Sequence, residues 1–228
     1  MTLRATKTKR ATATRAKAAP RASAKGRVPG SAPARAKLAI HPLTPDRWGD
    51  LERLFGPHGA CAGCWCMWPR RTSTEGKVSG EPNRRAFRKL VADGPPPGLL
   101  AYAGDVPVGW VAIAPRAEYV RFARSRVLAP VDGEPVWSVP CFFVARGQRG
   151  RGLTVALLEA ACAWARKQGA RIVEGYPIDT HGQSYAPAFA WHGLVPTFTA
   201  AGFHEVLRRS DRRPILRRAL RATGAKRG

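Results

Sequence analysis

Apolar residues recur three or four positions apart in several stretches of this chain, the spacing that places them on one face of a helix. We expect helices over residues 44–55, 83–92, 153–167 and 195–201. Thr44 and Pro45 favour the start of the first helix, because threonine caps helices and proline suits their first turn. The third stretch is the longest, and its apolar stripe consists of Leu153, Ala156, Leu157, Ala160 and Trp164.

Short apolar runs bounded by turn residues predict strands over much of the remaining chain. The runs are residues 38–40, 99–103, 106–114, 136–144, 171–176, 204–209 and 214–220. Residues 99–103 and 106–114 form a predicted hairpin, since only Gly104 and Asp105 separate them. Residues 115–134 are predicted to be a polar, arginine-rich connection. The order of elements predicts an α/β fold, with a mixed, central twisted sheet flanked by helices.

The formal net charge of +24 is concentrated towards the ends of the chain. Residues 1–37 contain eleven Lys/Arg and no Asp/Glu, with few large apolar side chains, so we expect a disordered basic tail there. Residues 38–220 are then a single globular domain, and residues 221–228 a basic C-terminal tail. Because basic segments attract polyanions, residues 1–37 are either a solvated extension or a contact for nucleic acid.

The chain contains five cysteines, an odd number that fits a reducing compartment. No apolar run has the length of a membrane span or the pattern of a signal peptide, so we expect a cytoplasmic protein without membrane contact. Cys61, Cys64 and Cys66 lie close to His58, but so compact a set fits tetrahedral metal binding poorly. We therefore expect no metal, and small, partly buried thiols in a loop rich in aromatic residues.

Residues 141–154 place an apolar run, a turn rich in glycine and arginine, and a helix start directly after one another. This order suits phosphate binding, because glycines let backbone N–H groups approach an oxygen-rich ligand and the helix N-terminus favours negative charge. Arg149 and Arg151 add forked donors. The pattern is not a P-loop, since no Gly-Lys-Ser/Thr follows, and it is a poor dinucleotide fingerprint.

The spacing within this turn is more specific than its glycine content. Val144 lies five residues before Arg149, and Gly150 and Gly152 flank Arg151. In this respect the stretch resembles the acyl-CoA-binding motif of the GNAT superfamily of N-acyltransferases. The resemblance implies acetyl-CoA as the cosubstrate, with the pantetheine arm bound by the backbone of a splayed strand and the pyrophosphate bound by the start of the helix.

The resemblance extends over residues 38–220, because the order of elements is similar and Gly202-Phe203 resembles the turn after the family's final helix. Thr154 stands where the family usually has Gly or Ala, and its hydroxyl can still donate to phosphate. Carried over by position, pantetheine would meet Phe142, Phe143 and Val144. The pyrophosphate would meet Arg149, Gly150, Arg151, Gly152, Leu153 and Thr154.

Two positions depart from the family pattern and affect the catalytic assignment. Phe198 replaces the Tyr that often protonates the departing thiolate, and Trp191 replaces a frequent Asn. Tyr176 and Tyr185 are candidate acids instead. Glu174 is the candidate base, since strand alternation places it on the same face as Tyr176 and burial would raise its pKa. The alternatives are an ion pair with arginine for Glu174 and core packing for Tyr176.

Other groups have less specific roles in this interpretation. Asp179 and His192 are further candidate bases. A backbone N–H near Phe143 or Val144 would polarise the thioester carbonyl. The loop between the first two helices either packs those helices onto the sheet or covers the acceptor site, through Trp65, Met67 and Trp68.

The resemblance implies an N-acetyltransferase that moves an acetyl group from acetyl-CoA to a primary amine on a small molecule, a peptide or a protein. Direct attack within a ternary complex is the family's usual mechanism. The alternative is a non-catalytic or CoA-sensing protein of the same fold, docked on nucleic acid or ribosomes by its basic termini. Phe198 favours this alternative, whereas the intact turn over residues 149–152 favours the enzyme.

Overall fold

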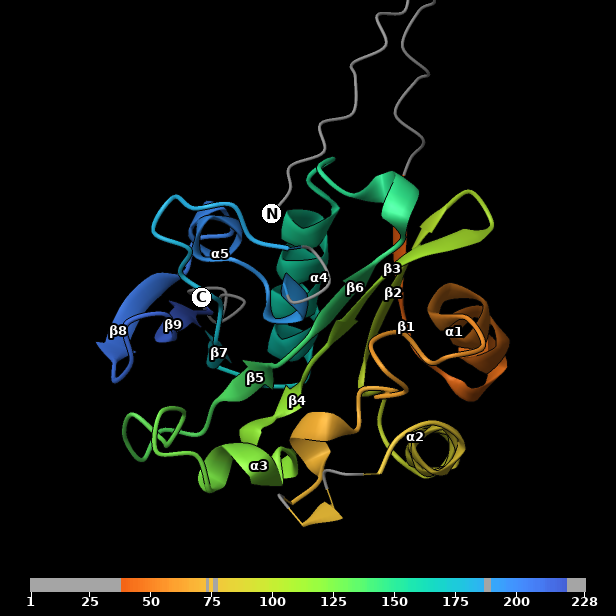
Figure 1. The fold of residues 1–228 in the computed structure, drawn as a ribbon, viewed down its shortest axis with the longest axis horizontal. Coiled ribbons are helices and arrows are strands. Elements are labelled where there is room, and N and C mark those ends of the chain that lie inside the picture. The colour runs from red at the N-terminus through yellow and green to blue at the C-terminus, as the bar shows by residue number, and fades with distance from the viewer. Residues whose placement is uncertain (1–37, 73, 76–77, 187–189, 221–228) are drawn as a thin grey trace, which may run out of the picture. The chain divides into compact units, whose positions relative to one another are not determined.

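The structure is a computed structural model that describes residues 38–72, 74–75, 78–186 and 190–220. The two predicted basic tails, residues 1–37 and 221–228, lie outside these described residues, and so does any nucleic-acid contact that they make. Within the described part, two β-sheets are packed together with helices (Figure 1).

Antiparallel strands form the first sheet in the order β1-β2-β3-β6. Their bounds are Leu38–Pro42 for β1, Gly98–Ala103 for β2, Val106–Ala112 for β3 and Phe142–Val144 for β6. β2 and β3 form the predicted hairpin, in which Gly104 has a φ of +59°. β6 is an edge strand of this sheet, and Figure 1 shows it on the side of the second sheet.

The second sheet has the strand order β4-β5-β7-β9-β8. The bounds are Ala114–Pro115 for β4, Trp137–Val139 for β5, Ile172–Gly175 for β7, His204–Arg208 for β8 and Pro214–Ala219 for β9. β5 and β7 are parallel, and the other neighbours are antiparallel. The sheet content is therefore mixed, as predicted.

The predicted strand over residues 136–144 is in fact two strands, β5 and β6, interrupted at Pro140 and Cys141. Proline has no N–H to donate to a strand ladder, so it favours an irregularity in a sheet. Cys141 still accepts a hydrogen bond from the Ala112 N–H at 3.0 Å. The interruption sends β5 into the second sheet and β6 into the first, so the sheets diverge at this point.

The helices cover both faces of the first sheet, as Figure 1 shows. Because side chains alternate along β2, Leu100 and Tyr102 share a core with α1 and α2, whereas Leu99 and Ala101 share one with α4. The helix bounds are Trp48–Phe55 for α1, Glu81–Asp93 for α2, Leu153–Lys167 for α4 and Val195–Ala200 for α5. These four correspond to the predicted helices, and the predicted α/β fold is confirmed.

Residues 115–134, predicted as a polar connection, contain a further short helix, α3 (Val120–Ala123). Its Phe122 is buried with Tyr119 and Leu128 in a third apolar cluster. The prediction missed this helix because a few apolar residues among many arginines form no helical period. In the part of the chain that the structure describes, no helix has both the length and the apolar character needed to cross a membrane.

Candidate active site

The outer edge of β6 presents backbone groups that no strand of either sheet pairs with. Phe143 lies opposite Trp110 of β3, and the Ala145 N–H two residues on donates to β3 at 2.9 Å. Because bonding alternates along an antiparallel pair, the amide of Phe143 faces β3 and those of Phe142 and Val144 face away. Of the two amides expected to polarise a carbonyl, only that of Val144 faces the gap between the sheets.

β6 continues into the glycine- and arginine-rich turn. A 3₁₀ turn, η5 (Arg146–Gln148), comes first, and Gly150 and Gly152 then have φ values of +73° and +78°. A Cβ at Gly150 would have no atom within 4 Å, so backbone conformation rather than space requires glycine there. Gly152 caps α4 without a side-chain hydrogen bond, which leaves the first N–H groups of α4 directed out of the helix end.

Arg149 is positioned by the strand that precedes it. Its Nε–H donates to the Val144 carbonyl at 3.1 Å, while both Arg149 and Arg151 are exposed. Outward amides on a strand edge, an open helix end and two guanidinium groups thus follow one another along the chain. They fit a ligand that carries a diphosphate at one end of an amide-bearing arm.

A cavity of about 680 Å³ lies between β6 and the α1–α2 loop, of which residues 56–72, 74–75 and 78–80 are described. This volume falls within the roughly 300–1,000 Å³ of small-molecule pockets. Arg71 and Arg149 reach the cavity, and no aspartate or glutamate of the described ranges lines it. Its aromatic walls are Phe55, Trp68, Phe142, Phe143 and Trp191.

The α1–α2 loop has a strained backbone where it meets the cavity. Of the residues predicted either to pack or to line a site, Trp68 lines the cavity, and Trp65 and Met67 are buried in the core with α1 and α2. Non-glycine residues with positive φ gather in this loop: Ala60, Ala62, Trp65 and Cys66. Such backbone conformations cluster at ligand-binding sites, where the surrounding structure holds them in place.

Thiols form part of the cavity wall beside β6. Cys66 and Cys141 have their sulfur atoms 3.2 Å apart, and Trp110 Nε1–H donates to Cys66 Sγ at 3.0 Å. The neighbouring Cys66 thiol and burial raise the pKa of Cys141 well above its usual range, and burial raises the pKa of Cys64 to about 11. Both thiols are therefore neutral at physiological pH and poor nucleophiles.

Within the described ranges, no group of three or more His, Cys, Asp or Glu side chains is placed to hold a metal ion.

His192 is a buried imidazole next to the cavity wall, with 4% of its surface exposed. Its Nδ1 lies 2.8 Å from the Pro140 carbonyl, which can only accept, so Nδ1 carries the hydrogen and Nε2 is an acceptor. Burial, and next the charge of Arg213, hold the pKa of His192 well below its usual range. Its ring centroid lies 3.5 Å from that of Trp191 and 6.1 Å from that of Trp68.

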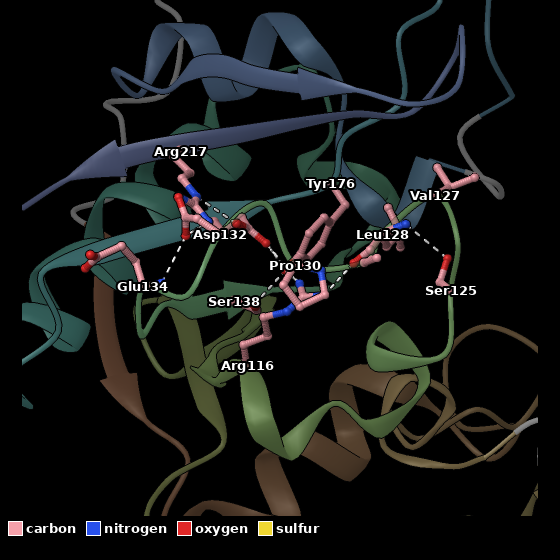
Figure 2. A network of polar contacts seen from close by, with 12 residues as sticks. Arg116, Ser125, Val127, Leu128, Pro130, Asp132, Glu134, Ser138, Tyr176 and Arg217 are labelled. Carbon is pink, nitrogen blue, oxygen red and sulfur yellow. Dashed lines mark hydrogen bonds and ion pairs between the residues drawn. The ribbon is translucent and has the colours of Figure 1, made fainter.

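Tyr176 lies in a buried polar network with Arg116, Ser138 and Arg217 (Figure 2). Glu174 belongs to the same network, and neither Glu174 nor Tyr176 lines the cavity. Glu174 Oε1 accepts from Arg116 at 2.9 Å and from the Tyr176 hydroxyl at 2.6 Å. Its Oε2 accepts from Arg217 at 2.8 Å, and Arg217 also donates to Asp132 at 2.6 and 3.1 Å. The ion pair considered for Glu174 is therefore present, and the catalytic roles of both residues stay a prediction.

The environment of Tyr176 affects its value as an acid. Burial, and next the charge of Glu174, raise the pKa of its phenol well above the usual range. Ser138 Oγ lies 2.8 Å from the same hydroxyl. This phenol remains protonated at physiological pH, with its hydrogen directed to Glu174.

The position of the missing tyrosine is occupied by tightly packed apolar groups. The Phe198 ring is fully buried, with its centroid 5.9 Å from that of Phe142 and 5.1 Å from that of Phe203. A Cβ at Gly175 would lie 2.0 Å from the Phe198 ring, so Gly175 is required by this close approach. Phe198 therefore fills the core beside β7 and offers no proton donor.

The remaining candidates lie at the surface. Tyr185 is partly exposed, and Asp179 pairs with Arg208 at 2.9 Å. The cavity itself, and Arg71 within it, were not singled out by sequence reasoning, because its walls come from segments far apart in the chain.

Part of the chain matches a known protein family. Residues 63–183, which are 121 of the 228 residues, match the family model described as "Acetyltransferase (GNAT) family". No curated protein matches the chain.

Several solved structures resemble the chain at low sequence identity. A GNAT-family acetyltransferase from Streptococcus pneumoniae is 16% identical, with 81% of this chain and 99% of that one covered and a TM-score of 0.46. The GNAT domain of S. lividans PAT is 19% identical, with 79% and 89% covered and a TM-score of 0.47. An acetyltransferase from Thermus thermophilus is 20% identical, with 82% and 99% covered and a TM-score of 0.45.

Proposed function

Because this chain belongs to the GNAT acetyltransferase family, we propose that it transfers an acetyl group from acetyl-CoA to a primary amine, as a cytoplasmic enzyme. The observation that carries the proposal is the continuity of β6, the glycine turn and the open end of α4 along residues 142–154. The outward amides of Phe142 and Val144 suit the amide groups of pantetheine. The turn that follows suits the pyrophosphate, with Arg149 and Arg151 beside it.

Acetyl-CoA supplies an activated acyl group as its thioester. The amine nitrogen forms a bond to the acetyl carbon while the carbon–sulfur bond breaks, one proton leaves the nitrogen and one reaches the sulfur. One of the two outward N–H groups of β6, that of Phe142 or that of Val144, polarises the thioester carbonyl while the other donates to pantetheine, since the Phe143 amide pairs with Trp110. The cavity of about 680 Å³ beside this strand gives the amine room to approach directly within a ternary complex.

A base is needed to take the proton from the amine, and two residues compete for this role. Glu174 is the base that the sequence predicts, but both its oxygens accept hydrogen bonds from buried partners. His192 is supported by its neutral state, its fixed tautomer and its packing against Trp68 and Trp191 of the cavity wall. For the acid that protonates the thiolate, Tyr176 stays a prediction.

The second candidate function is a CoA-binding protein without catalysis. It is favoured by one observation, the buried phenylalanine at position 198 where relatives use a tyrosine. This candidate shares every cofactor contact with the enzyme, so only a measurement of acetyl transfer separates the two.

The test is a transfer assay on the full chain with acetyl-CoA and pooled primary amines, including amino acids, polyamines and peptides. We expect a new acetylated product by mass spectrometry, together with release of the free CoA thiol. A rise in melting temperature with acetyl-CoA but no product from any pool would contradict the enzyme and favour the binding protein. No shift with any acyl-CoA would contradict both.

A further inference from the structure

Arg71 is fixed at the cavity by a buried amide. Its Nε–H donates to Asn83 Oδ1 at 2.7 Å. Asn83 is 2% exposed, and its own amide donates to the carbonyls of Gly63 at 3.2 Å and Val78 at 2.9 Å. The guanidinium of Arg71 is therefore oriented through Nε, while its two Nη groups have no acceptor within hydrogen-bond distance among the described residues.

The charged side chains among the described residues that line this cavity are all cationic. Arg71 and Arg149 line it, and no carboxylate of the described ranges does. Arg149 lies at the end of β6, next to the turn that suits the pyrophosphate of CoA. Arg71 comes from the α1–α2 loop on the other side of the cavity. The exposed carboxylate of Glu75 in that loop acts on Arg71 through its charge but does not line the cavity, so the Nη groups of Arg71 stay open to the second reactant.

The chemistry of the walls limits what that reactant is. A polyamine or a lysine side chain would bring further positive charge into a space that offers it no carboxylate. A carboxylate matches the planar fork of a guanidinium and makes charge-assisted hydrogen bonds with it. The aromatic walls, which include Phe55, Trp68 and Trp191, suit an apolar body.

We infer that the acceptor carries a carboxylate close to its amine, bound by Arg71, and an aromatic or branched apolar body: a hydrophobic amino acid or a close analogue. This inference rests on the proposed function and names its acceptor class. Arg71 is then the residue that determines specificity, since it binds the carboxylate while the amine faces the thioester beside β6.

A binding test separates this inference from catalysis. The full chain, saturated with CoA, is titrated with the N-acetyl derivatives of phenylalanine, leucine and tryptophan and with the matching C-terminal amides. In at least one pair we expect the acid to bind roughly 10- to 100-fold more tightly than the amide, as for a charged hydrogen bond. Arg71→Gln should remove that difference, and Arg71→Lys should retain part of it.

Arg88→Gln is the matched control, because it removes an exposed arginine from α2 that does not line the cavity. It should keep the preference for the acid. Acids that bind no more tightly than amides in every pair, or a preference that survives Arg71→Gln, would overturn the inference.

Transfer kinetics with the free amino acids and their amides complete the test. The assay is run at neutral pH, where the amide has the less basic amine and therefore the larger unprotonated fraction, so a preference for the acid in kcat/KM cannot come from the supply of unprotonated amine. Arg71→Gln should raise KM for the acid and leave the KM for acetyl-CoA unchanged. Acetyl transfer without a carboxylate preference would keep the enzyme and overturn the inference. Arg71-dependent binding of the acids without any transfer would support the carboxylate site and contradict the proposed enzyme.

Discussion

At the scale of a single residue, His192 has the tautomer and the neutral charge state that a general base needs. Its Nδ1–H is bonded to the Pro140 carbonyl, so the lone pair is on Nε2. Burial holds its pKa well below the usual range, so the imidazole is neutral at every pH at which the amine is reactive, and it is a weaker base than an exposed histidine. Its place beside Pro140 puts it where β5 and β6 separate, next to the edge that offers the Val144 amide.

His192→Asn tests this role, since the asparagine amide can replace the Nδ1–H donor but supplies no base. We expect kcat to fall by about 10²- to 10⁴-fold, the usual contribution of general base catalysis, with acetyl-CoA affinity unchanged. Glu174→Gln, measured at a temperature at which it is folded, should keep kcat within about threefold of wild type. The opposite ranking of the two variants would assign the base to Glu174, as the sequence first predicted.

The sequence alone could not decide whether Glu174 or His192 is the base. The partners of Glu174 lie 58 and 43 positions away, at Arg116 and Arg217, and no periodicity pairs residues at such distances. Several arginines were equally good partners on sequence grounds. For His192, the single sequence signal was its chemistry, because burial and tautomer depend on a carbonyl 52 positions away.

At the scale of elements, the Glu174 network joins the connection between β4 and β5 to the second sheet. Arg116 and Asp132 belong to that connection and Arg217 to β9 (Figure 2). Glu174, which joins them, belongs to β7. Exposed fractions of 13%, 0% and 9% for the Arg116, Glu174 and Arg217 side chains mean that solvent screens these charges little. A single missing carboxylate would leave two cations without a buried counter-charge.

Glu174→Gln should therefore lower the free energy of unfolding by about 3 kcal/mol, the order expected when one member of a buried ion pair is removed. The measurement is urea denaturation followed by tryptophan fluorescence. Glu159→Gln, at an exposed position of α4, is the control and should stay within about 0.5 kcal/mol of wild type. Equal stabilities of the two variants would contradict the role of the network.

The observed bounds of the elements agree with the predicted ones where apolar residues are regularly spaced. They differ where a single residue, such as a proline, interrupts the element. The predicted helix over residues 153–167 coincides with α4, because its apolar stripe is uninterrupted and Gly169, at φ +88°, follows it. The strand predicted through residue 140 breaks there, since proline cannot donate to the ladder. That break also creates the free edge of β6, so the departure falls at the candidate site.

At the scale of the whole molecule, His192 makes folding depend on pH. The unfolded chain takes up a proton on His192 near its ordinary pKa of about 6.5, while the folded chain keeps the imidazole neutral. Stability from this group is thus fully present above about pH 6.5 and is lost as pH falls below it. The loss is at most about 1.4 kcal/mol per pH unit for one proton.

Urea unfolding between pH 7.5 and pH 5.5 measures this dependence. The free energy of unfolding of wild type should fall over that interval. That of His192→Asn should fall less, by about the amount that the uptake of one proton on His192 accounts for. His204→Asn, which removes an exposed imidazole from β8, should behave as wild type. A pH dependence that is identical in wild type and His192→Asn would show that the imidazole is not held neutral.

The central claim is that β6, the glycine turn and α4 together bind acyl-CoA. Titration calorimetry with acetyl-CoA tests it most directly on wild type, Gly150→Glu and Gly169→Glu. Both glycines have positive φ and open space around them, so the two substitutions add the same charge and a similar backbone strain. They differ in location, because Gly169 lies at the far end of α4. We predict saturable binding to wild type and Gly169→Glu, and affinity reduced by at least about 100-fold in Gly150→Glu. Equal binding by all three proteins, or binding by none, would contradict the account.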